Sequence, residues 1–240
     1  MISVALASYN GEKYIEKQIA SILRELGEGD ELVISDDGST DRTIEIIKSF
    51  DDSRINLITN PGPAHGTRAN SENALCHTRG DLIFMSDQDD LWMPGKVSTM
   101  LNVLTPGIDL VHHDSVVTDE GLNELSPSLY ELMNNGPGVI KNMKRGSFYG
   151  SHMLITRRLL ELCKPFPEND EVGHDLWIGL VASMKCQMKF IPDKLIYYRR
   201  HESAHCDLFK PSKRSLATKL YGRVVMLKYI ARFLLKNHGS

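Results

Sequence analysis

Short apolar runs and helical patterns alternate along the first 90 residues, and this alternation restricts the fold more than any other feature. The apolar runs are typical of buried strands, and the segments between them place apolar residues at helical spacing. The expected strands are ISVALASYN (2–10), ELVISDDGST (31–40), RINLITN (54–60) and DLIFMSDQDD (81–90), and the expected helices are 11–26, 41–50 and 69–78. The alternation predicts an α/β fold with a mainly parallel sheet and helices on both faces.

Three of these expected strands end in polar clusters, which read SYN, SDDGST and SDQDD. In open α/β sheets, ligands bind outside the carboxyl ends of the strands. The clusters therefore predict a ligand site at this edge of the sheet.

The SDQDD cluster places Asp87, Asp89 and Asp90 within four positions. Their mutual repulsion falls if a divalent cation binds there, and carboxylates suit Mg²⁺ or Mn²⁺. In an extended chain Asp87 and Asp89 point to the same side. Asp90 points elsewhere, and we expect it to cap a helix within residues 91–101. A turn or a cap is the alternative role for any single one of these carboxylates.

The SDDGSTD segment contains a second pair of adjacent carboxylates, Asp36 and Asp37. A turn followed by a helix cap at Thr40 or Asp41 is the structural interpretation. The functional one is that a carboxylate here accepts the imide N–H of uracil or thymine. The sequence has neither a GxGxxG motif after its first strand nor a GxxxxGK[ST] motif. We therefore expect a metal ion, helped by Arg68, to neutralise the phosphates of a ligand.

The second half of the sequence is less regular. We expect a strand pair with a turn at 109–119, a loop or insert at 119–149, a strand leading into a helix at 151–163, a helix at 174–185, strand pairs at 187–201 and a helix at 214–236.

Charge is unevenly distributed along the chain. Residues 208–240 hold eight of the 28 Lys and Arg and no acidic residue, which leaves 20 basic and 31 acidic residues in 1–207. The sequence thus divides into a domain at 1–207 and a basic amphipathic helical tail at 208–240. The tail predicts a helix on an anionic membrane surface, or else a helix packed on the body or in a dimer interface. The acidic body argues against a nucleic-acid partner.

The length of 240 residues suits one sizeable α/β domain. The four cysteines have no CxxC spacing, which favours free thiols in a reducing compartment. The sequence shows neither a basic leader nor an apolar run of about 18 residues. We therefore expect a cytoplasmic protein, peripheral on the inner face of the plasma membrane if the tail binds lipid.

Three motifs, ALASYNGEKYIEKQIASIL, ELVISDDGSTDRT and SDQDDLWMPGKV, together resemble those of family-2 nucleotide-sugar glycosyltransferases with the GT-A fold. The resemblance covers roughly residues 1–205. The SDQDDLW form is similar to the branch that includes bacterial rhamnosyltransferases and other polysaccharide-assembly enzymes. The resemblance implies a nucleotide-binding half at 1–110 and an acceptor-side half at 111–207.

The resemblance also implies roles for particular residues on the donor side. Asp87-Gln88-Asp89 corresponds to the D-x-D motif, in which Asp89 binds Mn²⁺ or Mg²⁺ and Asp87 contacts the ribose or supports the metal ion. Donor-binding roles fall on Ala7, Tyr9 (which stacks on the base), Asp37 (which accepts from the pyrimidine N3–H), Arg68, Asp87 and Gln88.

On the acceptor side, the HDLW stretch lies where the family has a Glu-Asp motif, with His174 in place of the Glu. The resemblance implies that Asp175 is the catalytic base, whereas capping of the following helix is its structural alternative. His201 lies where some relatives have a histidine near the metal ion. His112, His113 and Asp114 form a cluster that could be a metal site, but a strand would point the two imidazoles to opposite faces. We therefore expect His112 and His113 to be structural or to line the acceptor site. Trp177 is expected either in the core or against a sugar.

These features predict an inverting, metal-dependent glycosyltransferase. It would move a sugar from a UDP- or dTDP-sugar to a hydroxyl of a saccharide acceptor, either free or lipid-linked, in bacterial surface polysaccharide synthesis such as that of O-antigen or capsule. One alternative is a nucleotidyltransferase, which normally has a glycine-rich loop that this sequence lacks. The other is a non-catalytic module that binds nucleotide sugars or glycans.

Overall fold

The computed structural model describes residues 1–62, 64–144, 146–201, 208 and 214–236. Cys206 and the expected tail residues 209–213 and 237–240 lie outside the described part of the chain. Cys76, Cys163 and Cys186 are free thiols.

The first 90 residues fold as the sequence predicts, with four parallel strands adjacent in the order β3-β2-β1-β4. Their bounds are β1 Ile2–Ser8, β2 Glu31–Asp36, β3 Ile55–Thr59 and β4 Leu82–Asp87, and the helices between them are α1 Ile15–Leu23, α2 Thr43–Ser49 and α3 Thr67–His77. The register places Ala7 beside Ser35 on one side and Asp87 on the other. The polar clusters that follow β1, β2 and β4 therefore meet at one edge of the sheet.

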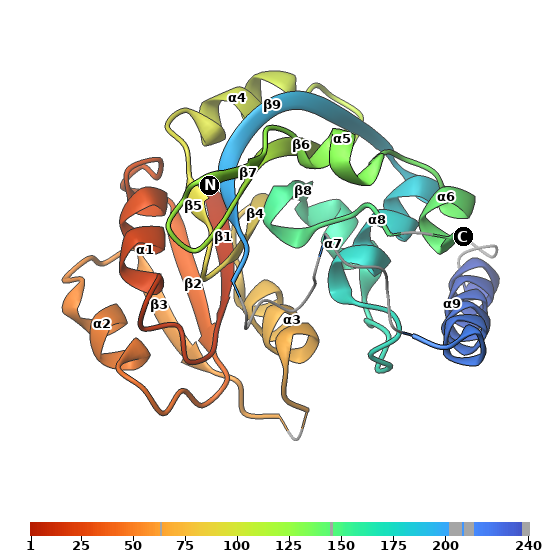
Figure 1. The fold of residues 1–240 in the computed structure, drawn as a ribbon, viewed down its shortest axis with the longest axis horizontal. Coiled ribbons are helices and arrows are strands. Elements are labelled where there is room, and N and C mark those ends of the chain that lie inside the picture. The colour runs from red at the N-terminus through yellow and green to blue at the C-terminus, as the bar shows by residue number, and fades with distance from the viewer. Residues whose placement is uncertain (63, 145, 202–207, 209–213, 237–240) are drawn as a thin grey trace.

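The second half extends this sheet in the order β8-β6-β9-β5 beyond β4. The remaining strands are β5 Leu91–Trp92, β6 Ile108–Thr118, β7 Glu124–Ser126, β8 Met153–Thr156 and β9 Gln187–Arg199. β8 is antiparallel to both β4 and β6, whereas β9 runs parallel to β6. The result is one mixed, strongly curved sheet, over which β9 arches in Figure 1.

Three expectations for the second half are wrong. Residues 109–119 and 187–201 do not form strand pairs, because β6 and β9 are each one continuous strand. The turn-like Pro192-Asp193 is accommodated as a bulge, where the partner on β9 shifts from Ile191, opposite His113, to Lys194, opposite Asp114. The insert at 119–149 is not simply a loop, since it contains β7, α5 (Leu129–Met133) and α6 (Val139–Lys144).

Helices cover both faces of the sheet (Figure 1). α1 buries Ile15, Ile19 and Ile22 in one core cluster, in which α4 (Lys96–Val103) also packs. The opposite cluster joins α3 to α7 (Arg157–Cys163), α8 (His174–Lys185) and the C-terminal α9 (Leu216–Lys236). The expected tail helix is thus present. The division of the chain at residues 207 and 208, and the two halves 1–110 and 111–207, stay predictions.

No helix among the described residues combines the length and the apolar character needed to cross a bilayer.

Candidate active site

The carboxyl ends of β1, β2 and β4 bring the loop at Tyr9, the carboxylate of Asp37 and the SDQDD segment to one edge of the sheet. This juxtaposition follows from the parallel register, which sets Asp87 beside Ala7. The side chain of Tyr9 is 53% exposed at this edge. An exposed aromatic ring beside a polar cleft edge can stack on a planar ligand.

The side-chain amide of Gln88 holds the Tyr9 loop. Its Oε1 accepts a hydrogen bond from the Tyr9 N–H, and its Nε2 donates one to the Tyr9 carbonyl, both at 2.9 Å. Gly11 makes this approach feasible, because a Cβ at Gly11 would lie 2.2 Å from Gln88 Oε1. The side chain of Gln88 thus engages the donor-site backbone, and direct contact with a donor stays a prediction.

The Asp37 carboxylate lies in a ring of hydrogen-bond donors. Asn60 donates to Oδ1 at 2.7 Å, His65 Nδ1 lies 2.9 Å from the same oxygen, and the Gly66 N–H donates to Oδ2 at 2.7 Å. Burial opposes ionisation of this group, but these hydrogen bonds hold the pKa of Asp37 below its usual value. Asp37 is therefore a carboxylate at neutral pH, the state that can accept a base N–H.

Asp89 and His201 are far apart in the sequence but are in contact in the fold. Asp89 Oδ2 lies 2.8 Å from His201 Nε2, and the exposed fractions of the two side chains are 21% and 10%. The His201 ring packs against Tyr14, at 4.9 Å between centroids. The predicted metal residues thus form a pair that is close to, but not sealed from, solvent.

Asp87 lies in a strongly negative environment. Burial of the Asp87 carboxylate, followed by the charges of Asp89 and Asp175, raises its pKa to about 7. The charge of Asp175, the expected base, thus acts on the first carboxylate of the SDQDD segment. Bringing a cation to this cluster would relieve the repulsion.

Asp90 does not cap a helix, contrary to the sequence-based expectation. Residues 91–92 form β5 instead, and α4 begins only at Lys96, after an N-cap at Gly95. Asp90 is 1% exposed and accepts a hydrogen bond from the Arg199 N–H at 3.1 Å, so it joins the acidic turn to β9. Burial, together with the charges of Asp89 and Asp87, raises the pKa of Asp90 well above its usual value.

A buried lysine lies beneath this acidic group. Lys96 is 0% exposed, its Nζ donates to the Ser151 carbonyl at 2.8 Å, and it lies over the Trp92 ring at 4.3 Å. Burial lowers the pKa of Lys96 to about 7, while the charges of Asp90 and Asp87 act in the opposite direction. Lys96 is thus the internal counter-charge of the cluster.

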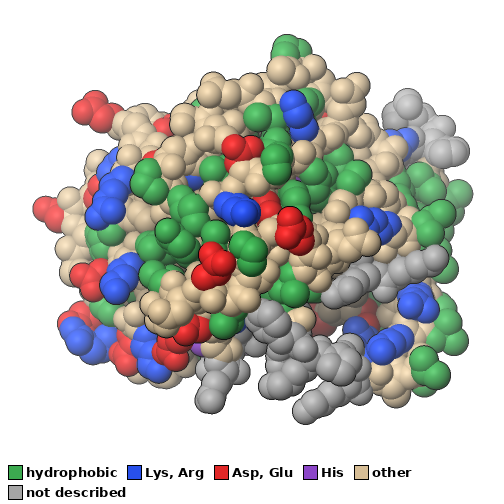
Figure 2. Space-filling model, turned by 45° about the horizontal axis from the view of Figure 1, so that its top comes forward, with side chains coloured by type: hydrophobic (Ala, Val, Ile, Leu, Met, Phe, Trp, Pro, Cys, Tyr) green, Lys and Arg blue, Asp and Glu red, His purple; other side chains and the backbone are tan. Residues whose placement is uncertain are grey.

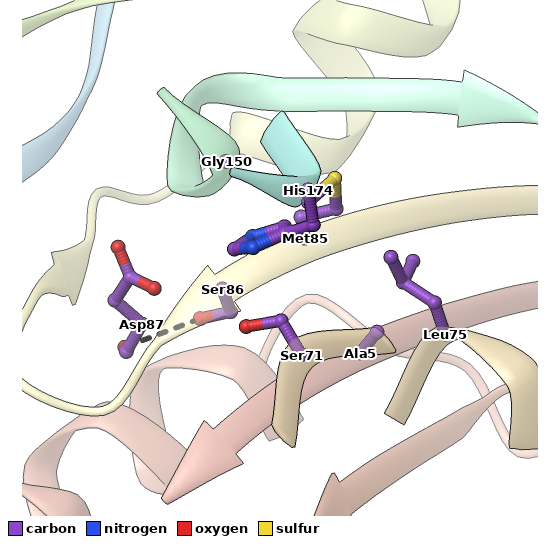
Figure 3. Close-up of a pocket in the computed structure, with 8 residues that line it drawn as sticks. All are labelled: Ala5, Ser71, Leu75, Met85, Ser86, Asp87, Gly150 and His174. Atoms are coloured by element: carbon purple, nitrogen blue, oxygen red, sulfur yellow. Dashed lines mark hydrogen bonds between the residues drawn. The ribbon is translucent and has the colours of Figure 1, made fainter. Parts of the chain in front are cut away.

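His174 and Asp175 are the first two residues of α8. Gly173 is the N-cap, so Asp175 is not the capping residue, but its Oδ1 accepts a hydrogen bond from the Leu176 N–H at 2.6 Å in the first turn. Gly150 permits the close approach of this turn, because a Cβ there would lie 3.3 Å from His174 Nε2. Figure 3 shows His174 beside Met85 and Gly150, in a small pocket whose rim includes Asp87.

Arg68 binds protein groups in this structure. Its Nε donates to Asp170 at 2.8 Å, and its Nη1 donates to Glu72 at 3.0 Å and to the Pro167 carbonyl at 3.2 Å. Arg68 therefore ties α3 to the loop that precedes α8. Its predicted contact with a donor phosphate stays a prediction.

The side chains that could bind a metal ion fit a divalent cation that also binds water and substrate. Among the described residues, no group of three or more His, Cys, Asp or Glu side chains is preformed as a metal site. Asp89, His201 and the nearby Asp87 supply too few ligands for a closed site. Mg²⁺ and, by the same oxygen chemistry, Mn²⁺ are usually bound by one or two carboxylates together with water and substrate phosphates.

Several residues that shape the site were not singled out from the sequence. Asn60 and His65 hold Asp37, and Lys96 and Ser151 lie under the acidic turn. Lys96 belongs to the motif SDQDDLWMPGKV, but only tertiary packing reveals that its charge is buried.

His112, His113 and His152 are fully buried and stack on one another or on Phe190, so they are structural in this fold. Trp177 is also buried, and its ring packs on α9.

Comparison with known proteins gives a family match. The family described as "Glycosyl transferase family 2" matches residues 3–162. An Escherichia coli protein, "UDP-Glc:alpha-D-GlcNAc-diphosphoundecaprenol beta-1,3-glucosyltransferase WfgD", is 29% identical over 164 residues, which are 68% of this chain and 56% of that protein. "dTDP-rhamnosyl transferase RfbG" of Shigella flexneri is 33% identical over 105 residues, 41% of this chain and 36% of the relative. The chain thus spans little more than half of WfgD.

Solved structures share the fold. Staphylococcus aureus TarS 1–349 in complex with UDP-GlcNAc has a TM-score of 0.73 at 17% identity, covering 95% of this chain and 66% of that one. Mannosyltransferase PcManGT of Pyrobaculum calidifontis, in complex with GDP-Man and Mn²⁺, has a TM-score of 0.61 at 21% identity, covering 82% and 56%. These likenesses confirm the predicted GT-A fold.

Proposed function

The chain belongs to glycosyl transferase family 2, and from this premise we propose that it transfers a sugar from a UDP- or dTDP-sugar to a hydroxyl of a saccharide acceptor. The observation that carries the proposal is the contact between Asp89 and His201, beside Asp87 and within electrostatic reach of Asp175. Asp89 and His201 are the residues that would hold a cation beside a diphosphate, and Asp175, whose charge acts on Asp87, is the carboxylate that would act on the acceptor.

The base of the donor lies against the Tyr9 loop. Tyr9 stacks on the pyrimidine, Ala7 lines it, and the ionised Asp37 accepts its N3–H. Asp37 Oδ2 accepts only one protein hydrogen bond among those of the described residues, which leaves it an acceptor position. Both uracil and thymine present this N–H, so the site serves UDP and dTDP alike.

Asp89 and His201 would hold a divalent cation, with Asp87 beside them. When bound, Mn²⁺ or Mg²⁺ supplies positive charge that stabilises the diphosphate as the bond to it breaks. The chain's own contribution is the placement of Asp89 by the acidic turn, which Asp90 anchors to β9 through the Arg199 N–H.

Asp175 acts as the general base in a single displacement with inversion. It takes the proton from the acceptor hydroxyl while that oxygen bonds to the anomeric carbon. The bond from this carbon to the diphosphate oxygen breaks at the same time, and the nucleoside diphosphate leaves with the electron pair. Asp175 is partly exposed in the first turn of α8, which leaves its carboxylate accessible to an acceptor.

The acceptor we propose is a saccharide on a lipid carrier, in bacterial surface polysaccharide synthesis. Its support is the similarity to WfgD, whose name states a substrate with a diphosphoundecaprenol group. We also propose a cytoplasmic location at the inner face of the membrane, where such an acceptor would be met.

A donor panel tests the transferase proposal. The purified chain with Mn²⁺ or Mg²⁺ is offered UDP- and dTDP-sugars, with and without saccharide diphosphate-lipid acceptors, and release of nucleoside diphosphate is recorded. We expect one donor to turn over and Asp175→Asn to lower the rate by about 10²–10⁴-fold while UDP binding is kept. The exposed Asp193→Asn is the matched control and should leave the rate unchanged. Binding of donor without transfer to any acceptor would instead indicate a non-catalytic module.

A further inference from the structure

We propose that the exposed face of α9 is a docking surface for an anionic lipid bilayer. The proposal goes beyond sugar transfer and does not depend on it. It rests on two apolar faces of one helix, only one of which is covered by protein.

The first face of α9 anchors the helix to the body. Val225, Met226, Ile230 and Phe233 are buried in the core cluster shared with α7 and α8. The Phe233 ring meets the Trp177 ring edge-on, at 5.7 Å between centroids and 88°. The expectation that the tail packs on the body therefore describes this face, and it fixes which side of the helix points outward.

The second face is apolar and exposed. Leu216, Leu220, Val224, Leu227 and Leu235 recur at intervals of three, four or eight residues, which places them on one side of a helix. They are 84%, 61%, 57%, 52% and 80% exposed. With Tyr221, this helix carries six of the ten exposed large hydrophobic side chains found in the described part of the chain. Such a concentration marks an interaction surface rather than scattered apolar residues.

Basic residues line both sides of this stripe. At about 100° per residue, Lys219 and Arg223 fall on one side and Lys228 falls on the other. Arg232 and Lys236 lie further round the helix, where they line a pocket with Glu161 and Glu168 of the body. No acidic residue occurs in 208–240, whereas the rest of the sequence has an excess of acidic residues. Figure 2 shows hydrophobic and basic side chains together along the right edge, where α9 lies in Figure 1.

This charge pattern favours lipid over a second copy of the chain. Two α9 stripes facing each other would bring basic flanks against basic flanks, which repel. An anionic bilayer complements both flanks and takes up the apolar stripe between them. The 21 residues of α9 form a rod of about 31 Å that would lie in the plane of the interface. The excess of acidic residues in 1–207 makes this face differ in charge from the rest of the chain.

Vesicle flotation tests the proposal with the full chain. The probes are phosphatidylcholine vesicles with and without phosphatidylglycerol. We expect binding only to the anionic vesicles and at least about tenfold weaker binding for Leu220→Gln/Val224→Gln/Leu227→Gln. Leu125→Gln/Ile140→Gln, which changes two exposed apolar side chains elsewhere, should bind as the wild type does.

A charge pair completes the test. Arg223→Gln/Lys228→Gln should weaken binding about fivefold for each charge removed, and Lys17→Gln/Lys48→Gln on exposed positions of α1 and α2 should not. All of the substituted side chains are exposed, so thermal unfolding should be unchanged and should exclude misfolding. Equal vesicle binding by the wild type and the α9 triple variant would overturn the proposal. So would a dimer in solution that the triple variant dissociates, which would assign the face to a second copy.

Discussion

The side-chain amide of Gln88 makes two reciprocal hydrogen bonds of 2.9 Å with the backbone N–H and C=O of Tyr9. These hydrogen bonds link the turn at Asp87–Asp89 to the Tyr9 loop, which we propose to bind the nucleotide base. A sugar donor would therefore meet the turn and the loop already held in position, which lowers the entropic cost of ordering the site on binding.

Removing this clamp should weaken donor binding without unfolding the protein. In Gly11→Ala, the new Cβ would approach Gln88 Oε1 to 2.2 Å, and in Gln88→Ala both hydrogen bonds are lost. At about 1 kcal/mol for each hydrogen bond, we expect UDP affinity, measured by calorimetry, to fall at least about tenfold. Gly29→Ala is the control, because a Cβ there meets nothing within 4 Å. Unchanged affinity in Gln88→Ala would mean that the loop keeps its position without the clamp.

Metal affinity should rise with pH through the pKa of Asp87. In the fold this pKa is raised to about 7, so the folded state holds the proton more tightly than the unfolded chain does. As the pH rises from about 4 to about 7, the contribution of Asp87 to the stability of the metal-free fold is lost. Over the upper part of that range, the side chain becomes a carboxylate that can bind a cation. We expect Mn²⁺ affinity to increase about tenfold from about pH 6 to pH 8. In Asp87→Asn this increase should be smaller. A pH-independent affinity in the wild type would show that Asp87 is not linked to the metal ion.

Lys96→Met should destabilise the fold and the acidic turn together. The substitution keeps an apolar stem of similar length but removes the buried cation that opposes Asp90 and Asp87. Loss of its hydrogen bond to the Ser151 carbonyl and of the charge that opposes these carboxylates should cost about 1–3 kcal/mol, which chemical denaturation can measure. Exposed Lys17→Met is the comparison and should change stability by less than about 0.5 kcal/mol. A stable Lys96→Met protein would show that Asp90 and Asp87 are already protonated in the fold.

α9 should contribute to the stability of the domain through its buried face. Phe233→Ala removes the ring that packs on Trp177, and we expect a loss of about 2–4 kcal/mol in the free energy of unfolding. Leu235→Ala, in the same helix but 80% exposed, should cost less than about 0.5 kcal/mol. Similar losses in the two variants would mean that the buried and exposed faces are not distinguished in solution.

The sequence predicts the first half of the fold well, because its strands are parallel, buried and separated by regular helices. The same regularity locates the site, since strands that run in parallel must end at the same edge. The second half fails where tertiary pairing overrides local signals. Pro192 and Asp193 look like a turn, but β6 on the neighbouring side holds them within a continuous strand as a bulge.

The site shows the same limit. The spacing of the residues identifies the acidic cluster, but it wrongly predicts that Asp90 caps a helix. That helix begins only at Lys96. Spacing also cannot show that Lys96 is buried beneath the cluster, or that Asn60 and His65 hold Asp37. These facts depend on packing between segments far apart in the chain. For α9, the apolar spacing is visible in the sequence, but its division into a covered face and an open face requires the structure.

The most direct test of the proposed site is the binding of UDP and dTDP, measured by calorimetry with and without Mn²⁺. We predict that at least one of them binds, that Mn²⁺ strengthens the binding, that Asp89→Ala removes the effect of Mn²⁺, and that Asp37→Ala weakens the binding whether or not the metal is present. Asp193→Ala, at an exposed position, should behave as the wild type does. If neither nucleotide binds in the presence of Mn²⁺, the assignment of the Asp37 and Asp89 edge as a donor site is wrong.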